Sequence, residues 1–169
     1  MEKFFYKLNR QCGYLNTHCL DHFIAEKSFS NIIHGFNIEK IEKTLWKKEI
    51  VLHEIDKNFP IKDVVIIYME PNKCYKWHRD RYRLSTINLL LSANESSYTL
   101  FSENYDNDED QSNISRLKYE PNCFYVFNTQ EIHTVMNFSQ PRYMISCQFN
   151  DAATSDYQSV KEYCKVIGI

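Results

Sequence analysis

Glycine is scarce in this chain. Its 169 residues include only three glycines, at positions 13, 35 and 168. P-loops and dinucleotide-binding turns need two or three glycines within about seven residues, because the backbone must closely approach a phosphate. The sequence can build neither motif, which excludes the nucleotide-dependent enzymes that use them.

Three further features are missing. There is no basic excess, since 20 Lys and Arg face 22 Asp and Glu, and this argues against a general nucleic-acid-binding protein. The longest wholly apolar run, Val64–Met69, has six residues, too few to span a membrane. The six cysteines form no CxxC pair and no signal peptide is visible. We therefore expect reduced cysteines and a cytoplasmic location.

The composition indicates one globular domain over residues 1–169, with 43% hydrophobic and 25% charged residues. Residues 1–62 are predicted to form a supporting region, 63–150 a β-barrel core, and 151–169 a C-terminal tail. A helix over about 37–58 is predicted within the supporting region. Its apolar residues recur mostly three or four positions apart: Ile38, Ile41, Leu45, Leu52, Ile55 and Phe59.

From residue 63 onward the pattern changes to short β-branched and aromatic segments separated by turn residues. Seven such segments within about 90 residues are typical of a barrel or a sandwich. The predicted strands are Val64–Met69, Leu84–Ser92, Ser97–Phe101, Leu117–Tyr119, Cys123–Phe127, Ile132–Asn137 and Arg142–Phe149.

Two histidines and an aspartate form the first candidate site. His78 and Asp80 are two residues apart, so on a strand their side chains would project from one face. His133 lies on another predicted strand. Two imidazoles and one carboxylate are the ligand set of non-haem Fe(II) oxygenases, and they leave three metal positions open. The zinc-hydrolase motif HExxH is absent.

The last predicted strand has an apolar face and a polar face. The polar face carries Arg142, Met144, Ser146 and Gln148. An arginine buried in a barrel needs an anionic partner, because an unpaired buried charge is costly. A dicarboxylate held at one end by Arg142 and at the other by a metal would supply that anion, and the Ser146 hydroxyl would add a hydrogen bond.

With these residues the sequence resembles the Fe(II)- and 2-oxoglutarate-dependent dioxygenases. Their pattern is His-x-Asp, a distal His, and an Arg with a Ser or Thr on the next strand. The spacing from His133 to Arg142 and Ser146 is similar to that of the prolyl hydroxylase branch. Residues 133–139 also resemble bacterial free-proline hydroxylases, which are related to aspartyl/asparaginyl hydroxylases. The resemblance covers residues 64–149.

This resemblance implies a mainly β fold, a double-stranded β-helix or jelly-roll, cupin-like barrel, backed by the N-terminal helix. It implies that His78, Asp80 and His133 hold Fe(II). It also implies that 2-oxoglutarate is bound by Arg142 and Ser146, with Tyr68 as a further donor. Oxidative decarboxylation of this co-substrate would then be coupled to hydroxylation of a C–H bond.

Two departures from the family pattern bear on the substrate. Gln148 stands where nucleic-acid demethylases carry a second arginine, which argues against a nucleic-acid substrate. Residues 70–73 (Glu-Pro-Asn-Lys) stand where typical protein prolyl hydroxylases carry glycines, which argues against a peptide.

A small carboxylate-bearing substrate, such as a free amino acid, is therefore the favoured prediction. A protein or peptide prolyl or aspartyl hydroxylase is the alternative. Arg81 and Arg83, with Arg79, are candidates to bind a substrate carboxylate, or else form a solvated rim. Asn88 is either a substrate contact or a satisfied core amide.

Other hypotheses remain open. Residues 103–115 carry five carboxylates and no basic residue, and would be a solvated loop or a lid over the site. A non-catalytic β-barrel that serves a structural or interaction role is an alternative of another class. An enzyme with zinc in the same ligand set is the third.

Overall fold

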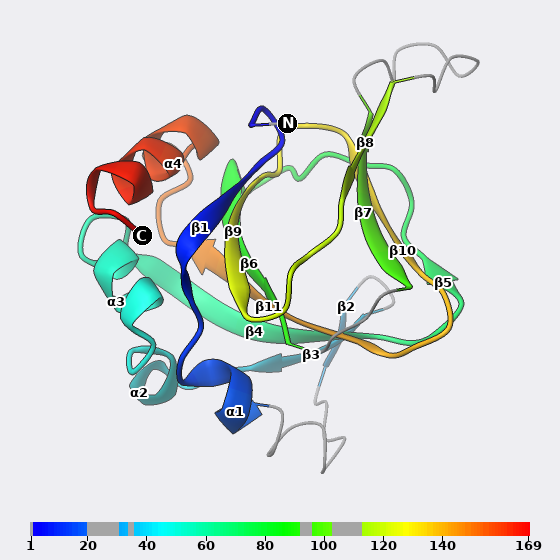
Figure 1. Cartoon of the computed structure of the whole chain (residues 1–169), viewed down its shortest axis with the longest axis horizontal. Coiled ribbons are helices and arrows are strands. Elements are labelled where there is room, and N and C mark those ends of the chain that lie inside the picture. Colours follow the sequence, from blue (N-terminus) through cyan, green and yellow to red (C-terminus); the bar gives the residue numbers. More distant parts are fainter. Residues whose placement is uncertain (1, 20–30, 34–35, 92–95, 103–112) are drawn as a thin grey trace.

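The computed structural model describes residues 2–19, 31–33, 36–91, 96–102 and 113–169. Its strands pair antiparallel in two sheets, drawn in Figure 1. The larger sheet has the order β1-β9-β6-β11-β4-β3-β2. Its strands are β1 (Phe5–Gln11), β2 (Asn31–Ile33), β3 (Phe36–Lys40), β4 (Ile61–Met69), β6 (Ser85–Leu90), β9 (Cys123–Asn128) and β11 (Arg142–Phe149). The smaller sheet, in the order β5-β10-β7-β8, contains β5 (Lys73–Cys74), β7 (Ser97–Ser102), β8 (Ile114–Leu117) and β10 (His133–Asn137).

The two sheets face each other (Figure 1). The interior between them is rich in aromatic side chains. Phe101 of β7 lies 4.9 Å from the rings of both Phe4 and Phe127, so side chains of the N-terminal segment and of both sheets meet there. The buried residues of this interior cluster are Phe4, Leu90, Phe101, Leu117, Tyr119, Cys123, Tyr125 and Phe127.

Helices cover the opposite face of the larger sheet (Figure 1). They are α1 (Leu15–Cys19), α2 (Lys43–Trp46), α3 (Ile50–Asp56) and α4 (Tyr157–Val166). Leu52 and Ile55 of α3 and Val160 of α4 are fully buried in the same cluster as Ile66 and Ile145 of the sheet. This helix-covered cluster is the main hydrophobic core.

Strand alternation separates the two cores. In β9, Cys123, Tyr125 and Phe127 belong to the interior cluster, whereas Phe124 and Val126 belong to the helix-covered cluster. This follows from the two-residue period of a strand, which directs successive side chains to opposite faces. β9 is buried on both faces as far as Phe127, and this explains why its sequence is a continuous apolar run up to that residue.

The predicted helix over 37–58 is wrong in its first part and interrupted in its second. Residues 36–40 form β3, which pairs with β4 through Asn37↔Tyr68 and Ile38↔Ile67. Helical periodicity resumes only in α2 and α3, with a break between them. The Ile38–Ile41 spacing suits a helix locally, but β3 satisfies its backbone hydrogen bonds along the edge of β4, and this tertiary pairing overrides the local pattern.

Both chain ends also differ from the prediction. Phe5–Gln11 forms the strand β1 and pairs with β9. The predicted C-terminal tail contains α4, whose N-cap Asp156 accepts hydrogen bonds from the backbone N–H groups of Gln158 and Ser159. β8 lies at 114–117 rather than at 117–119. The other six predicted strands are present with small shifts at their ends.

All six cysteines are free thiols. Within the described part of the chain, no helix has the length and apolar character that a membrane crossing requires.

Replacement of a central core residue should test the helix-covered cluster. Ile145 of β11 is fully buried there. We expect Ile145→Ala to lower the free energy of unfolding by about 2–5 kcal/mol, because it removes buried methyl groups and leaves a cavity. Val166→Ala, at a residue that is 84% exposed, is the control and should change it by less than about 0.5 kcal/mol. Urea unfolding measures both, and equal effects would contradict this account of the core.

Candidate active site

The candidate metal ligands are brought together by backbone hydrogen bonds between two segments. His78 lies in the irregular segment that links β5 to β6, and His133 begins β10. The two residues form an isolated antiparallel bridge in which each backbone N–H donates to the other residue's carbonyl, with both N–O distances 3.0 Å. Side chains of directly opposed residues share a face, so both imidazoles point into the barrel.

Each imidazole is oriented by a hydrogen bond to the main chain. His78 Nδ1 lies 2.9 Å from the carbonyl oxygen of Lys76, and His133 Nδ1 lies 2.9 Å from that of Glu131. A carbonyl oxygen only accepts, so both Nδ1 atoms carry a proton, and in a neutral ring this leaves the Nε2 lone pair for a metal. Such an outer contact fixes the tautomer and ring orientation of a metal-binding histidine.

Burial keeps one of these imidazoles neutral. His133 packs against the rings of Phe127 and Phe101, with centroids 4.9 and 6.1 Å away. Its pKa falls to about 4, chiefly because burial disfavours the charged ring. His133 is therefore neutral at pH 7, which is the state that a metal ligand requires.

Asp80 completes the cluster. Its Oδ1 lies 3.5 Å from His78 Nε2, while Oδ2 is ion-paired with Arg83. Burial raises the pKa of Asp80, but the neighbouring His78 side chain and the charge of Arg83 outweigh it, so the pKa is lowered. The carboxylate is thus ionised at neutral pH.

The donor set fits a divalent transition metal. One ligand atom from each of His78, Asp80 and His133 can be chosen so that all three lie within 4.8 Å of one another. Two imidazoles and one carboxylate suit Fe(II) and leave other coordination positions open. The structure thus brings together the three residues that the sequence predicted as metal ligands.

Arg142 lies inside the same barrel and is 2% exposed. Its guanidinium donates to the hydroxyls of Ser97 and Thr99 and lies 5.3 Å from the centre of the Tyr119 ring. Nη2 also lies 3.2 Å from the sulfur of Met144. Among the described residues its partners are all neutral, so a buried positive charge lacks an anion there.

Tyr119 is the main residue near Arg142 that sequence reasoning missed. Burial raises the pKa of its phenol, although Arg142 and hydrogen bonds with Asn88 and Thr99 oppose this. The neutral hydroxyl therefore stands beside the guanidinium as a further polar group. The alternation Ser97-x-Thr99-x-Phe101 was a sequence signal for hydroxyls on an inward face. Only the facing of the two sheets shows that they meet Arg142.

Ser146, predicted to bind the co-substrate together with Arg142, has other partners in this structure. Both residues face the interior, but Met144 lies between them on the same face of β11. The Ser146 hydroxyl lies 3.1 Å from that of Thr86 and 3.4 Å from Nη1 of Arg83. Alternate residues on a strand are about 6.6 Å apart, so the Cα atoms of Arg142 and Ser146 are about 13 Å apart. The two side chains accordingly bind different partners.

Tyr68, predicted as a further co-substrate donor, packs against the helix-covered core instead. It pairs directly with Tyr143 in the β4–β11 ladder, and the two rings are 5.0 Å apart. Tyr143 belongs to the helix-covered core, and Tyr68 packs against that core too. Tyr68 therefore lies on the sheet face opposite to Arg142, because one residue of strand register reverses the side-chain direction.

The predicted substrate contacts differ in their positions. Arg83 is engaged by Asp80 and Ser146, so it is not free to hold a substrate carboxylate. Arg79 and Arg81 are exposed. Asn88 faces the interior and hydrogen-bonds to Thr86 and to the Tyr119 hydroxyl, as a satisfied amide does. Most of the predicted lid, residues 103–112, lies outside the described residues.

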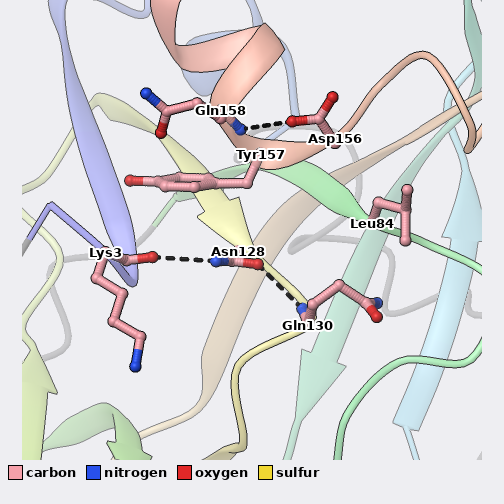
Figure 2. A pocket seen from close by; sticks show the side chains of 7 residues that line it. All are labelled: Lys3, Leu84, Asn128, Gln130, Asp156, Tyr157 and Gln158. Atoms are coloured by element: carbon pink, nitrogen blue, oxygen red, sulfur yellow. Dashed lines mark hydrogen bonds between the residues drawn. The ribbon is translucent and has the colours of Figure 1, made fainter.

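A separate open pocket of about 330 Å³ lies beside the start of α4 (Figure 2). Asn128 donates to the carbonyl of Lys3, and the backbone N–H of Gln130 donates to the Asn128 side chain. The N–H of Gln158 is capped by Asp156. The polar groups that line this pocket therefore largely hydrogen-bond to one another, and the pocket contains none of the candidate metal ligands.

Removal of either imidazole should abolish metal binding. We expect His78→Ala and His133→Ala to lose stoichiometric Fe(II) binding under anaerobic conditions, since two remaining ligands hold the ion poorly. Asp80→Ala should behave likewise. His53→Ala, at an exposed residue of α3, is the control and should bind as the wild type does. Anaerobic calorimetry measures this, and full binding by both imidazole variants would rule out the site.

Comparison with known proteins bears on the fold. No protein-family model matches the chain, and no curated protein matches it significantly. Among solved structures, the viral collagen prolyl hydroxylase of Paramecium bursaria Chlorella virus-1, in a 2-oxoglutarate complex, aligns with a TM-score of 0.61 and 13% identity over 86% of this chain and 95% of that one. A Trichoplax adhaerens prolyl hydroxylase in complex with a hypoxia-inducible-factor peptide gives 0.61 and 14% over 94% and 86%. A Pseudomonas putida prolyl-4-hydroxylase gives 0.56 and 18% over 80% and 83%. The chain therefore has the double-stranded β-helix fold of these prolyl hydroxylases, as the sequence predicted.

Proposed function

We propose that this protein is an Fe(II)- and 2-oxoglutarate-dependent dioxygenase that hydroxylates a C–H bond. The observation that carries the proposal is the pairing of two features in one barrel interior. His78, Asp80 and His133 offer converging ligand atoms, and the buried Arg142 lacks an anionic partner among the described residues. A non-catalytic barrel would need neither feature, and both are costly to bury.

The three ligands would hold Fe(II), which with bound 2-oxoglutarate and dioxygen supplies the oxidising chemistry that converts the co-substrate to succinate and CO2. The protein contributes orientation and exclusion of water. The carbonyls of Lys76 and Glu131 hold the two rings in place, and Phe101 and Phe127 shield His133 from solvent.

Arg142 would bind the distal carboxylate of 2-oxoglutarate. Thr99, one of its hydrogen-bond partners, is two residues from Phe101, and Phe101 pairs with His133 across the β7–β10 ladder. The guanidinium and the metal ligands therefore lie along the same inner surface of the smaller sheet. Ser97 and Tyr119 would add neutral hydrogen bonds at the carboxylate.

For the substrate class, a peptide gains support over a free amino acid. The preference for a small carboxylate substrate rested partly on Arg83, which Asp80 and Ser146 occupy. In addition, this chain aligns with 86% of the Trichoplax enzyme, which is in complex with a peptide. We propose a residue within a peptide, such as proline, as the first substrate class to test and a free amino acid as the second.

The six free cysteines suit a reducing compartment, and we propose a cytoplasmic location on that ground.

Arg142→Ala should raise the 2-oxoglutarate requirement and leave Fe(II) affinity nearly unchanged. Loss of a charge-assisted contact from a buried site costs roughly 2–5 kcal/mol, or about 30-fold to several thousand-fold. Tyr119→Phe should cost only about 0.5–1.5 kcal/mol, because it removes one neutral hydroxyl. Titration of the charge-transfer absorption of the anaerobic Fe(II)–2-oxoglutarate complex measures both. Equal damage in the two variants would contradict the role of Arg142.

A succinate-release screen tests the function itself. Wild-type protein with Fe(II), 2-oxoglutarate and oxygen is offered proline-containing peptides, free amino acids and oligonucleotides in parallel. We expect peptide-stimulated succinate formation that stops without oxygen and in the His78→Ala variant. Stimulation by free amino acids alone would reverse the substrate preference. Turnover without oxygen would favour a zinc enzyme, and the absence of iron and 2-oxoglutarate binding would favour a non-catalytic barrel.

A further inference from the structure

Arg83 makes the closest charged contacts of the candidate metal site, and its role differs from the one that the sequence suggested. Its Nη2 and Nε lie 2.6 and 2.9 Å from the same oxygen of Asp80, Oδ2. Its third nitrogen, Nη1, lies 3.4 Å from the Ser146 hydroxyl. All three guanidinium nitrogens therefore have partners within the protein.

The two carboxylate oxygens of Asp80 therefore have different partners. Oδ2 accepts a charge-assisted hydrogen bond from Arg83 Nε and is ion-paired with Nη2. Oδ1 instead lies beside His78 Nε2, where the ligand atoms converge. We propose that Arg83 is a positioning residue for the metal site. It holds Asp80 by one oxygen, so that the other oxygen alone is presented to the metal. This inference rests on the proposed metal site.

The consequence is a constraint on coordination. A free aspartate can bind a metal through one oxygen or through both. When Arg83 engages Oδ2, Asp80 occupies a single position, so co-substrate and dioxygen retain the remaining ones. Positioning contacts of this kind typically change metal affinity by roughly 10- to 100-fold when removed.

The surrounding backbone allows the side chain to be tested without unfolding the segment. The Arg83 carbonyl accepts hydrogen bonds from Thr129 Oγ1 and from Gln130 Nε2. Gln130 Nε2 also donates to the Asp80 carbonyl, and the Asp80 N–H donates to the Thr129 carbonyl. These four hydrogen bonds do not involve the Arg83 side chain, so truncation leaves them in place.

The experiment is Co(II) binding to the metal-free protein, followed by calorimetry and by visible absorption, with no turnover required. We expect Arg83→Ala to bind Co(II) about 10- to 100-fold more weakly, with an altered absorption spectrum, because Oδ2 becomes free to move or to coordinate. Arg83→Lys should restore most of the affinity and the wild-type spectrum, since an ammonium group can still bond Oδ2. Arg116→Ala, which removes an equal charge from an exposed position on β8, should match the wild type.

The outcomes separate this inference from the proposed function. Wild-type affinity and spectrum in Arg83→Ala, with wild-type thermal stability, would overturn the positioning role and leave the metal site standing. An equal loss of Co(II) affinity in Arg83→Ala and Arg83→Lys would also overturn it, because the cation retained beside Asp80 in the lysine variant would then not support metal binding. Absence of Co(II) binding by the wild-type protein would overturn both the inference and the proposed site.

Discussion

Strand β11 occupies the position on which the rest of the molecule depends. It is hydrogen-bonded to β4 along nearly its whole length and to β6 through residues 144–147. Its period of two sends Ile145 and Cys147 into the helix-covered core and sends Arg142 and Ser146 into the barrel. One strand thus anchors the larger sheet to its helices and presents polar groups to the interior, and a slip of one residue would exchange the two faces.

The candidate metal ligands depend on a second pairing, in the opposite sheet. His78 is not part of a regular strand, yet its mutual backbone hydrogen bonds with His133 align the two imidazoles. Their Nδ1 atoms are then held by carbonyls two residues earlier in each segment. The geometry of the site is therefore set mostly by the main chain, which is more rigid than long side chains and costs less entropy to hold in place.

Two arginines in the same barrel show how context decides the role of a charge. Arg142 is buried with neutral partners among the described residues, which suits a site for an incoming carboxylate. Arg83 already has an anion in Asp80 and is therefore satisfied within the protein. The two guanidiniums have the same chemistry, and their different partners suit one to the proposed binding role and the other to the proposed positioning role.

The sequence by itself determined the candidate metal-ligand set and the faces of β11. His-x-Asp, the distal His133 and the alternation from Arg142 to Phe149 are local patterns, and a strand's period of two translates them directly into geometry. Tertiary structure decided four other features. These are the β3 strand, the separation of Ser146 from Arg142, the direction of Tyr68 toward the helix-covered core, and the contacts of Tyr119. Each depends on which strand pairs with which, and in what register, and such pairings join residues tens of positions apart. Local propensity carries no information about them, because the hydrogen bonds that stabilise one register come from the partner strand.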